Sequence, residues 1–247
     1  MRHLSLALLP LAAIAATATA APWGDDRGPG IAPRHDGATL AYPVDGFTSV
    51  GLALPAQVEV RVGPAFSVRA TGPAEAFDDI RVTRNGDSLQ IEKRYRNGAR
   101  DERALRAVRF VVTMPRIQGA SIGGSGDITV DRVSGGQFDA AIGGSGSLTL
   151  GNLAVGRLTG SIGGSGSILA AGDARDLKVN IGGSGRFAGE RLRARGANIS
   201  IAGSGGVRAQ VDGDARVSIA GSGDADLGPR ARCAVSRVGS GKARCGA

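Results

Sequence analysis

Residues 121–150 read SIGGSGDITVDRVSGGQFDAAIGGSGSLTL, and the pentapeptide Ile-Gly-Gly-Ser-Gly occurs in them twice, 20 residues apart. The pattern Ile-(Gly/Ala)-Gly-Ser-Gly continues toward the C-terminus at intervals of 18 to 20 residues, and the last copy starts at Val238 and lacks one residue. The serines of the successive copies are Ser125, Ser145, Ser165, Ser184, Ser204, Ser222 and Ser240. A repeat of fixed length in this range predicts an array of stacked structural units.

Apolar residues alternate with polar residues on both sides of each motif. Leu177 and Val179 precede Ile181 at two-residue steps, and Phe187 follows the same motif. A period of two places these side chains on one face of a β-strand. Each repeat therefore predicts two short strands joined at the Gly-Ser-Gly bend, and Leu153 and Leu192 suggest a third short face. Because one rung cannot bury its own apolar face, we expect residues 116–247 to form parallel rungs stacked about 4.8 Å apart.

The last glycine of each motif is predicted to be a structural corner, where the chain adopts backbone angles that a Cβ atom disfavours. Replacement of Gly126 or Gly146 by valine is expected to cost more than about 1 kcal/mol of stability. The glycines in this position are Gly126, Gly146, Gly166, Gly185, Gly205 and Gly223.

The N-terminal part of the chain divides into three segments. Residues 1–20 combine Arg2 with a short apolar run and a small-residue end, which is typical of a secretory signal peptide cleaved after Ala20. Residues 21–44 are rich in glycine and proline without periodicity and predict a flexible arm or linker. Residues 45–115 alternate as strands do, with a hairpin turn predicted at Asn85-Gly86. This region is expected to cap or extend the stack, within one domain spanning 45–247.

Charge, cysteines and the predicted signal peptide bear on location and partners. A net charge of +8 favours an anionic partner, such as an envelope polymer, or an envelope protein. Two cysteines in an exported chain, Cys233 and Cys245, predict a disulfide, although two unpaired thiols are the alternative. After the signal peptide no segment is apolar enough to cross a bilayer as a helix. The expected location is the periplasm, the cell surface or the medium.

The repeated Gly-Ser-Gly resembles several catalytic or ligand-binding motifs but completes none of them. A serine triad lacks its base, because His35, in the predicted arm, is the only histidine after residue 20. The glycine-rich corners lack the repeated carboxylates of calcium-binding repeats. Gly239-Ser-Gly-Lys242 lacks the remaining residues of a phosphate-binding loop. We therefore expect no catalytic residue, no metal and no cofactor.

A basic cluster lies before the strand that begins near Val108, in a stretch interpreted as a hairpin loop. It predicts a contact surface for anions, with a simple solvated loop as the alternative. Tyr95 is its only aromatic residue, which is too little for a nucleic-acid stacking platform, so no specific nucleic acid is expected. The residues of the cluster are Lys93, Arg94, Arg96, Arg100, Arg103 and Arg106.

Several motifs together resemble the head GIN domain family of auto-transporter adhesins. They are Phe47-Thr-Ser-Val50, Gly86-Asp-Ser-Leu89, Val112-Thr-Met-Pro115 and Gly124-Ser-Gly-Asp127, followed by the iterated Gly-Ser-Gly. The resemblance covers about residues 45–245. It implies an all-β fold, a right-handed parallel β-helix or solenoid with rungs of about 20 residues, and a place in the cell envelope or at the surface. It brings no catalytic residues.

Three functions are compatible with these observations. The first is a non-enzymatic, adhesin-like domain that binds a polymer or protein along a rung face, and the second is a structural or assembly module of the envelope. The third is a polysaccharide-active enzyme, which would need paired carboxylates on one face. The candidate pairs are Asp127 with Asp131 and Asp212 with Asp214, and surface aspartates at these spacings usually mark turns.

Overall fold

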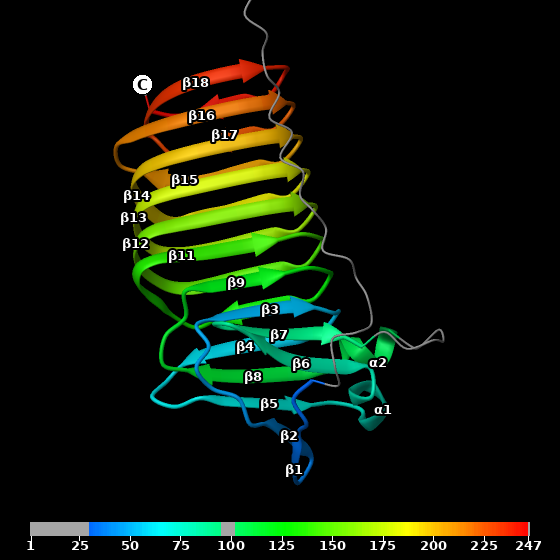
Figure 1. Cartoon of the computed structure of the whole chain (residues 1–247). Helices are drawn as coiled ribbons and strands as arrows, with labels where there is room; N and C mark the ends of the chain where they lie inside the picture. The colour runs from blue at the N-terminus through cyan, green and yellow to red at the C-terminus, as the bar shows by residue number, and fades with distance from the viewer. Residues whose placement is uncertain (1–29, 95–101, 247) are drawn as a thin grey trace, which may run out of the picture.

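The computed structural model describes residues 30–94 and 102–246, and strands account for 66% of it and helices for 4%. All of its strands join into one continuous sheet that is wound into a coil (Figure 1). In that view the chain crosses the near side from left to right while it rises toward the C-terminus, so the coil is right-handed. The prediction of an all-β, right-handed parallel β-helix is confirmed, with about six turns of solenoid.

The rungs begin at residue 119 and follow one another in chain order. Each strand pairs in parallel with the strand one repeat away, so the Gly-Ser-Gly motifs of successive rungs lie above one another. The strands are β9 (Gly119–Ile122), β10 (Asp127–Val130), β11 (Val133–Ile142), β12 (Ser147–Gly164), β13 (Ser167–Gly183), β14 (Arg186–Gly203), β15 (Gly206–Val211), β16 (Asp214–Gly221), β17 (Asp224–Asp226), β18 (Arg232–Val238) and β19 (Lys242–Arg244).

A complete rung has three faces, as β12 and β13 show. Residues 147–150 pair with 167–170 on the first face, directly after a Gly-Ser-Gly corner. The register shifts after Leu150, and residues 153–155 then pair with 172–174 on the second face. Residues 157–164 pair with 176–183 on the third face, which leads into the next corner. The additional short face that Leu153 and Leu192 suggested is the second of these three, and it is a regular part of each full rung.

The core consists of columns in which like residues stack on like. The isoleucines that open the corners form one column, which runs in register through Ile122, Ile142, Ile162, Ile181, Ile201 and Ile219. Each of them is 3% exposed or less. Four fully buried phenylalanines, including Phe138 and Phe187, are among the largest side chains of the interior. Stacking at the spacing of adjacent strands removes both faces of these side chains from water.

The corner glycines have a different physical reason from the predicted one. Gly166 does not have a positive φ angle, but a Cβ placed on it would lie 2.7 Å from the carbonyl oxygen of Gly146, one rung below. The same Cβ would lie 2.6 Å from Ile142 Cγ2. A positive φ angle occurs instead two residues earlier, at 151° in Gly164, and recurs at this position in the rungs above. Close approach between rungs, rather than backbone conformation, therefore excludes a side chain at Gly166.

The seventh corner begins one residue earlier than the sequence pattern predicts. Arg237, not Val238, pairs with Ile219 and occupies the isoleucine column, so no residue is missing. Val238 pairs with Ala220 and is 76% exposed. Among the described residues no rung lies above this one, so its inward position does not require an apolar side chain. The Arg237 guanidinium instead donates a hydrogen bond of 3.0 Å to the carbonyl oxygen of Gly241.

The N-terminal part both extends and closes the stack. β3 pairs in parallel with β9, and β4 with β10, so the coil continues below the first Gly-Ser-Gly corner. Antiparallel partners β2, β5 and β6 then cover the end (Figure 1). The elements are β1 (Arg34–Asp36), β2 (Thr39–Tyr42), β3 (Ser49–Ala53), β4 (Gln57–Val62), β5 (Ser67–Thr71), α1 (Ala74–Phe77), β6 (Ile80–Asn85), β7 (Ser88–Lys93), α2 (Glu102–Arg106) and β8 (Arg109–Met114).

Two local predictions in this region need correction. The segment 21–44, predicted to be a flexible arm, contains the antiparallel pair β1–β2, and β2 joins the sheet through β5. Its buried Leu40 and Tyr42 alternate with less buried residues over only four positions, which is too short a run to show in the sequence. The β6–β7 hairpin exists, but its two-residue turn is Gly86-Asp87, and among these residues only Gly86 has a positive φ angle. The predicted signal peptide, residues 1–20, and the first part of the predicted arm, residues 21–29, lie outside the described residues.

The two cysteines form the predicted disulfide. Cys233 on β18 and Cys245 after β19 are bonded, with their Cα atoms 6.1 Å apart. The bond ties the last two strands of the coil together at the end opposite the N-terminal cover. In the described part of the chain, no helix is both long and apolar enough to span a membrane.

Candidate binding surface

The basic cluster predicted from the sequence does not form one anion-binding loop in the described structure. Lys93 ends β7, and the half-buried Arg94 follows it. The backbone N–H of Arg94 donates a hydrogen bond of 2.7 Å to the carbonyl oxygen of Asp79. Arg103 and Arg106 lie on α2. β7 pairs with β3 and β6, whereas β8 pairs with β4 and β5, so the segment between them is a crossover rather than a hairpin loop. Arg96 and Arg100 lie outside the described residues.

Arg94 lies in a partly buried group of charged and aromatic side chains at the closed end of the coil. Arg81 and Glu92 form an ion pair there, with 3.1 Å between Arg81 Nη2 and Glu92 Oε1, and their side chains are 9% and 13% exposed. Burial raises the pKa of Tyr42 to about 12, although the nearby positive charge of Arg94 acts in the opposite direction. Arg94 is therefore half-buried near Tyr42, which limits its use for an outside ligand.

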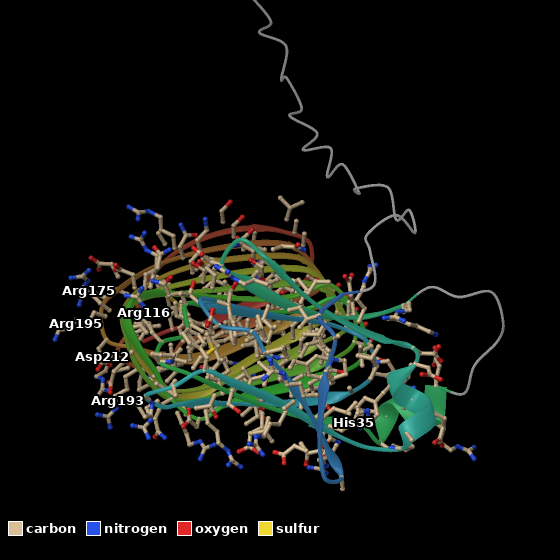
Figure 2. The ribbon with its side chains drawn as sticks, turned by 60° about the horizontal axis from the view of Figure 1, so that its bottom comes forward. His35, Arg116, Arg175, Arg193, Arg195 and Asp212 are labelled. Atoms are coloured by element: carbon tan, nitrogen blue, oxygen red, sulfur yellow. A yellow bond between two sulfur atoms is a disulfide. The ribbon has the colours of Figure 1, made fainter. Side chains whose placement is uncertain are left out.

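A different group of arginines lines a groove on the second face. The groove has a volume of about 660 Å³ and extends over the rungs from β11 to the turn after β15. Its floor consists of small residues such as Gly135, Gly156 and Ala174. Arg175, Arg193 and Arg195 stand around it together with Asp173 and Asp212. Figure 2 shows Arg175, Arg193, Arg195 and Asp212 pointing outward along one edge of the coil. This groove, the arginine groove, is the first candidate site.

The strand β14 explains how the arginines come together. Residues 190–195 read Glu-Arg-Leu-Arg-Ala-Arg, and Leu192 and Ala194 are buried while the arginines are exposed. A strand places every second residue on the same side, so Arg193 and Arg195 stand about 7 Å apart in one row. The register brings in a third arginine. Ala174 pairs with Ala194, and Asp176 with Gly196, so Arg175 lies beside Arg195 on the neighbouring rung.

The charges around the groove are only partly balanced. Asp212 is paired with Arg230, and Arg175 Nε lies 3.7 Å from Asp176 Oδ2. Among the described residues no ion pair within 4.0 Å involves Arg193 or Arg195. Like charges placed opposite one another on adjacent strands destabilise a sheet. Arg175 beside Arg195 is such a pair, and an anion bound between them would relieve the repulsion.

The carboxylates considered for glycoside hydrolysis hold the structure instead. Asp127 Oδ1 accepts the N–H of Ser147, and Asp131 Oδ1 accepts the N–H of Val62, at 3.1 Å in each case. Asp212 and Asp214 form ion pairs with arginines of the following rung. Each carboxylate connects two rungs.

Residue types that support metal or acid–base chemistry do not gather in the described structure. His35 lies exposed on β1, at a distance from the labelled arginines in Figure 2. The described residues contain no group of three or more His, Cys, Asp or Glu side chains that could hold a metal ion.

Sequence reasoning missed the arginine groove although a signal for it was present. The densest linear cluster of basic residues lies near residue 100, whereas Arg175 and Arg195 lie side by side only through the stacking of two rungs. If the repeats are aligned at their serines and the exposed positions of neighbouring repeats are compared, these two arginines fall side by side. The alternation in residues 190–195 already indicated one arginine-rich strand face.

Comparisons with known proteins agree with the fold. A structure described as that of a putative adhesin from Bacteroides fragilis superposes with a TM-score of 0.77 at 19% identity, over 87% of this chain and 100% of the other. A "putative lipid binding protein" from Parabacteroides distasonis gives a TM-score of 0.66 at 19% identity, over 84% and 95%. A putative adhesin from Parabacteroides merdae gives 0.65 at 13% identity, over 84% and 95%. At such identities the likeness concerns the fold alone.

A search of curated proteins gives no match. The model of one protein family, by contrast, matches residues 46–229, which is most of the chain and includes the strands from β3 onward and the corners up to Gly223. The chain therefore belongs to the family described as "Putative auto-transporter adhesin, head GIN domain".

Proposed function

We propose that this protein is an exported, non-enzymatic binding domain of the adhesin-like type, which captures an anionic polymer of the cell envelope on the arginine groove. The observation that carries the proposal is the placement of Arg175 beside Arg195, with Arg193 in the same row. Guanidinium groups form paired hydrogen bonds with carboxylates and phosphates, so an array of them suits a chain of repeated anions.

The shape of the surface supports a polymer over a small compact ligand. The groove is open and shallow, its floor is made of glycine and alanine, and it continues across several rungs. Rungs repeat about every 4.8 Å along the coil, so a ligand that also repeats can make several equivalent contacts. Many weak contacts in series give strong total binding without a deep pocket.

An assembly role is the alternative, and the free edge of β18 is the feature that would serve it. Val235 and Val238 on this edge are 49% and 76% exposed. Arg237, however, sits between them at the inward position and would have to lose water if a second strand covered the end. Inward-pointing charges are a common protection of open strand edges. This arrangement favours a ligand on the side of the coil over a partner at its end.

Binding of lipopolysaccharide, which carries repeated phosphates, tests the proposal. The double variant Arg175→Gln/Arg195→Gln should bind immobilised lipopolysaccharide about 30-fold more weakly at low salt, if each arginine contributes about 1 kcal/mol. Binding by the unaltered protein should fall as salt rises toward physiological strength. The matched control is Lys178→Gln/Arg216→Gln, which removes the same charge from the exposed third face. Equal loss in both double variants would show a general charge effect and would refute a groove-specific site.

A further inference from the structure

A second hollow lies on the first face near the C-terminal end, and the proposal above does not use it. Its volume is about 480 Å³, within the range of about 300–1,000 Å³ typical of small-molecule sites. It is lined by Arg186, Arg208, Lys242 and Arg244, by Asp224 and Asp226, and by Ser184 and Ser204, the serines of two corners.

The hollow exists because one column of side chains is interrupted. The outward position that directly follows each Gly-Ser-Gly corner is occupied rung after rung by a side chain, except at Gly206. In register, this column runs through Asp127, Ser147, Ser167, Arg186, Gly206, Asp224 and Lys242. Neighbouring rungs lie about 4.8 Å apart, so Arg186 and Asp224 stand about 10 Å from each other with a gap between them.

Gly206 is not required by the backbone. Its φ angle is not positive, and a Cβ placed on it would meet only the carbonyl oxygen of Asp224, at 3.9 Å. The corner glycine immediately before it, Gly205, would by contrast place a Cβ 2.7 Å from the carbonyl oxygen of Gly185. The fold therefore accounts for Gly205 but leaves Gly206 without a structural role. Gly206 lies at the centre of a charged hollow although packing does not require a glycine there. This combination points to a ligand that occupies the gap.

The lining combines two kinds of polar group. Arg208 and Arg244 flank Asp226 in the adjacent column, so cations lie on both sides of a carboxylate. Asp224 Oδ1 accepts the N–H of Lys242 at 3.0 Å, and Asp226 Oδ1 accepts that of Gly228 at 3.2 Å. These bonds hold both carboxylates in place, and each retains a second oxygen that can accept a ligand hydroxyl.

We propose that the Gly206 hollow binds one acidic sugar residue, a ring that carries a carboxylate or phosphate together with free hydroxyl groups. The arginines would bind the anionic group, Asp224 and Asp226 would accept hydrogen bonds from the hydroxyls, and the ring would occupy the space above Gly206. A simple anion would gain nothing from the two aspartates. A neutral sugar would leave Arg186, Lys242 and Arg244 without an anion, whereas Arg208 already lies 3.5 Å from a carboxylate oxygen of Glu190. This site lies on a different face from the arginine groove and does not depend on it.

The test is calorimetric titration with trigalacturonate and with glucose 6-phosphate, which represent the carboxylate and phosphate forms of the acidic sugar. We expect at least one of them to bind the unaltered protein. Gly206→Gln, whose Cβ makes no close contact and whose side chain would extend into the gap, should weaken this binding at least 10-fold. Arg208→Gln should weaken binding to a similar degree. Arg175→Gln/Arg195→Gln should leave it within 2-fold, which separates this site from the arginine groove.

Control ligands complete the experiment. Galactose, which lacks an anionic group, and inorganic sulfate, which lacks hydroxyls on a ring, should each bind at least 10-fold more weakly than the acidic sugar. Gly206→Ser, whose short side chain reproduces Ser147 and Ser167 of the same column, should melt like the unaltered protein and serves as the folding control. The proposal is wrong if neither acidic sugar binds, if sulfate binds equally well, or if Gly206→Gln binds as the unaltered protein does.

Discussion

Two glycines of the same corner, Gly185 and Gly182, should respond in opposite ways to replacement by alanine. A Cβ on Gly185 would lie 2.8 Å from the carbonyl oxygen of Gly166 and would also contact Ile162 Cγ2 too closely. A Cβ on Gly182 would have nothing within 4 Å. The sequence already contains alanine in the column of Gly182, because Ala202 and then Ala220 pair above it.

The magnitude follows from two opposing effects. Overpacking a close contact costs about 1–3 kcal/mol, and the carbonyl of Gly166 cannot move away without separating two hydrogen-bonded rungs. Replacing glycine by alanine also stabilises by about 0.4–1 kcal/mol, because the unfolded chain loses freedom. The second effect is the same for both variants and cancels in their difference. Gly185→Ala should therefore be less stable than Gly182→Ala by about 1–3 kcal/mol.

Thermal unfolding followed by circular dichroism measures this difference. For a domain of this size about 1 kcal/mol corresponds to roughly 2–4 °C, so the two melting temperatures should differ by about 2–12 °C. Gly182→Ala should melt at or slightly above the temperature of the unaltered protein. If the two variants melt together, then close approach between rungs is not what excludes a side chain from the corner, and the account of Gly166 and its equivalents fails with it.

Three further predictions concern the two ends of the coil. Replacing both Cys233 and Cys245 by alanine should cost about 3 kcal/mol and accelerate amide exchange in β18 more than in β12; unchanged stability would contradict a stapling role. Arg237→Leu should cause concentration-dependent association in light scattering, because it removes the inward charge from the open end, and a variant that stays monomeric would argue against this protection. In the variant Tyr95→Phe, Tyr42 is the one remaining tyrosine, and it should titrate near pH 12 in the folded protein and near pH 10 in denaturant. The free energy of unfolding should therefore decline from about pH 10 upward. A midpoint near pH 10 in the folded protein would show that burial does not raise this pKa.

The repeat itself could be predicted from the sequence because its cause is local. Each Ile-(Gly/Ala)-Gly-Ser-Gly motif performs the same task in every rung, and the isoleucines are placed in register by the repeat length alone. The Cys233–Cys245 disulfide could also be predicted from the sequence, because the two cysteines are even in number and close together in the chain. The β1–β2 pair could not be predicted from the sequence, because four alternating residues cannot be distinguished from an irregular segment.

The candidate sites depend on which residues of neighbouring rungs lie side by side, and the linear sequence does not show this pairing directly. Arg175 and Arg195 are neighbours only because Ala174 pairs with Ala194, and the hollow at Gly206 is visible only when it is compared with Arg186 below and Asp224 above. Inward positions of a solenoid must repeat, since each stacks on the next. Outward positions are free of that demand. A glycine in a column of larger outward side chains, or two like charges side by side, is therefore not explained by folding. Each of the two proposed sites lies at such a position.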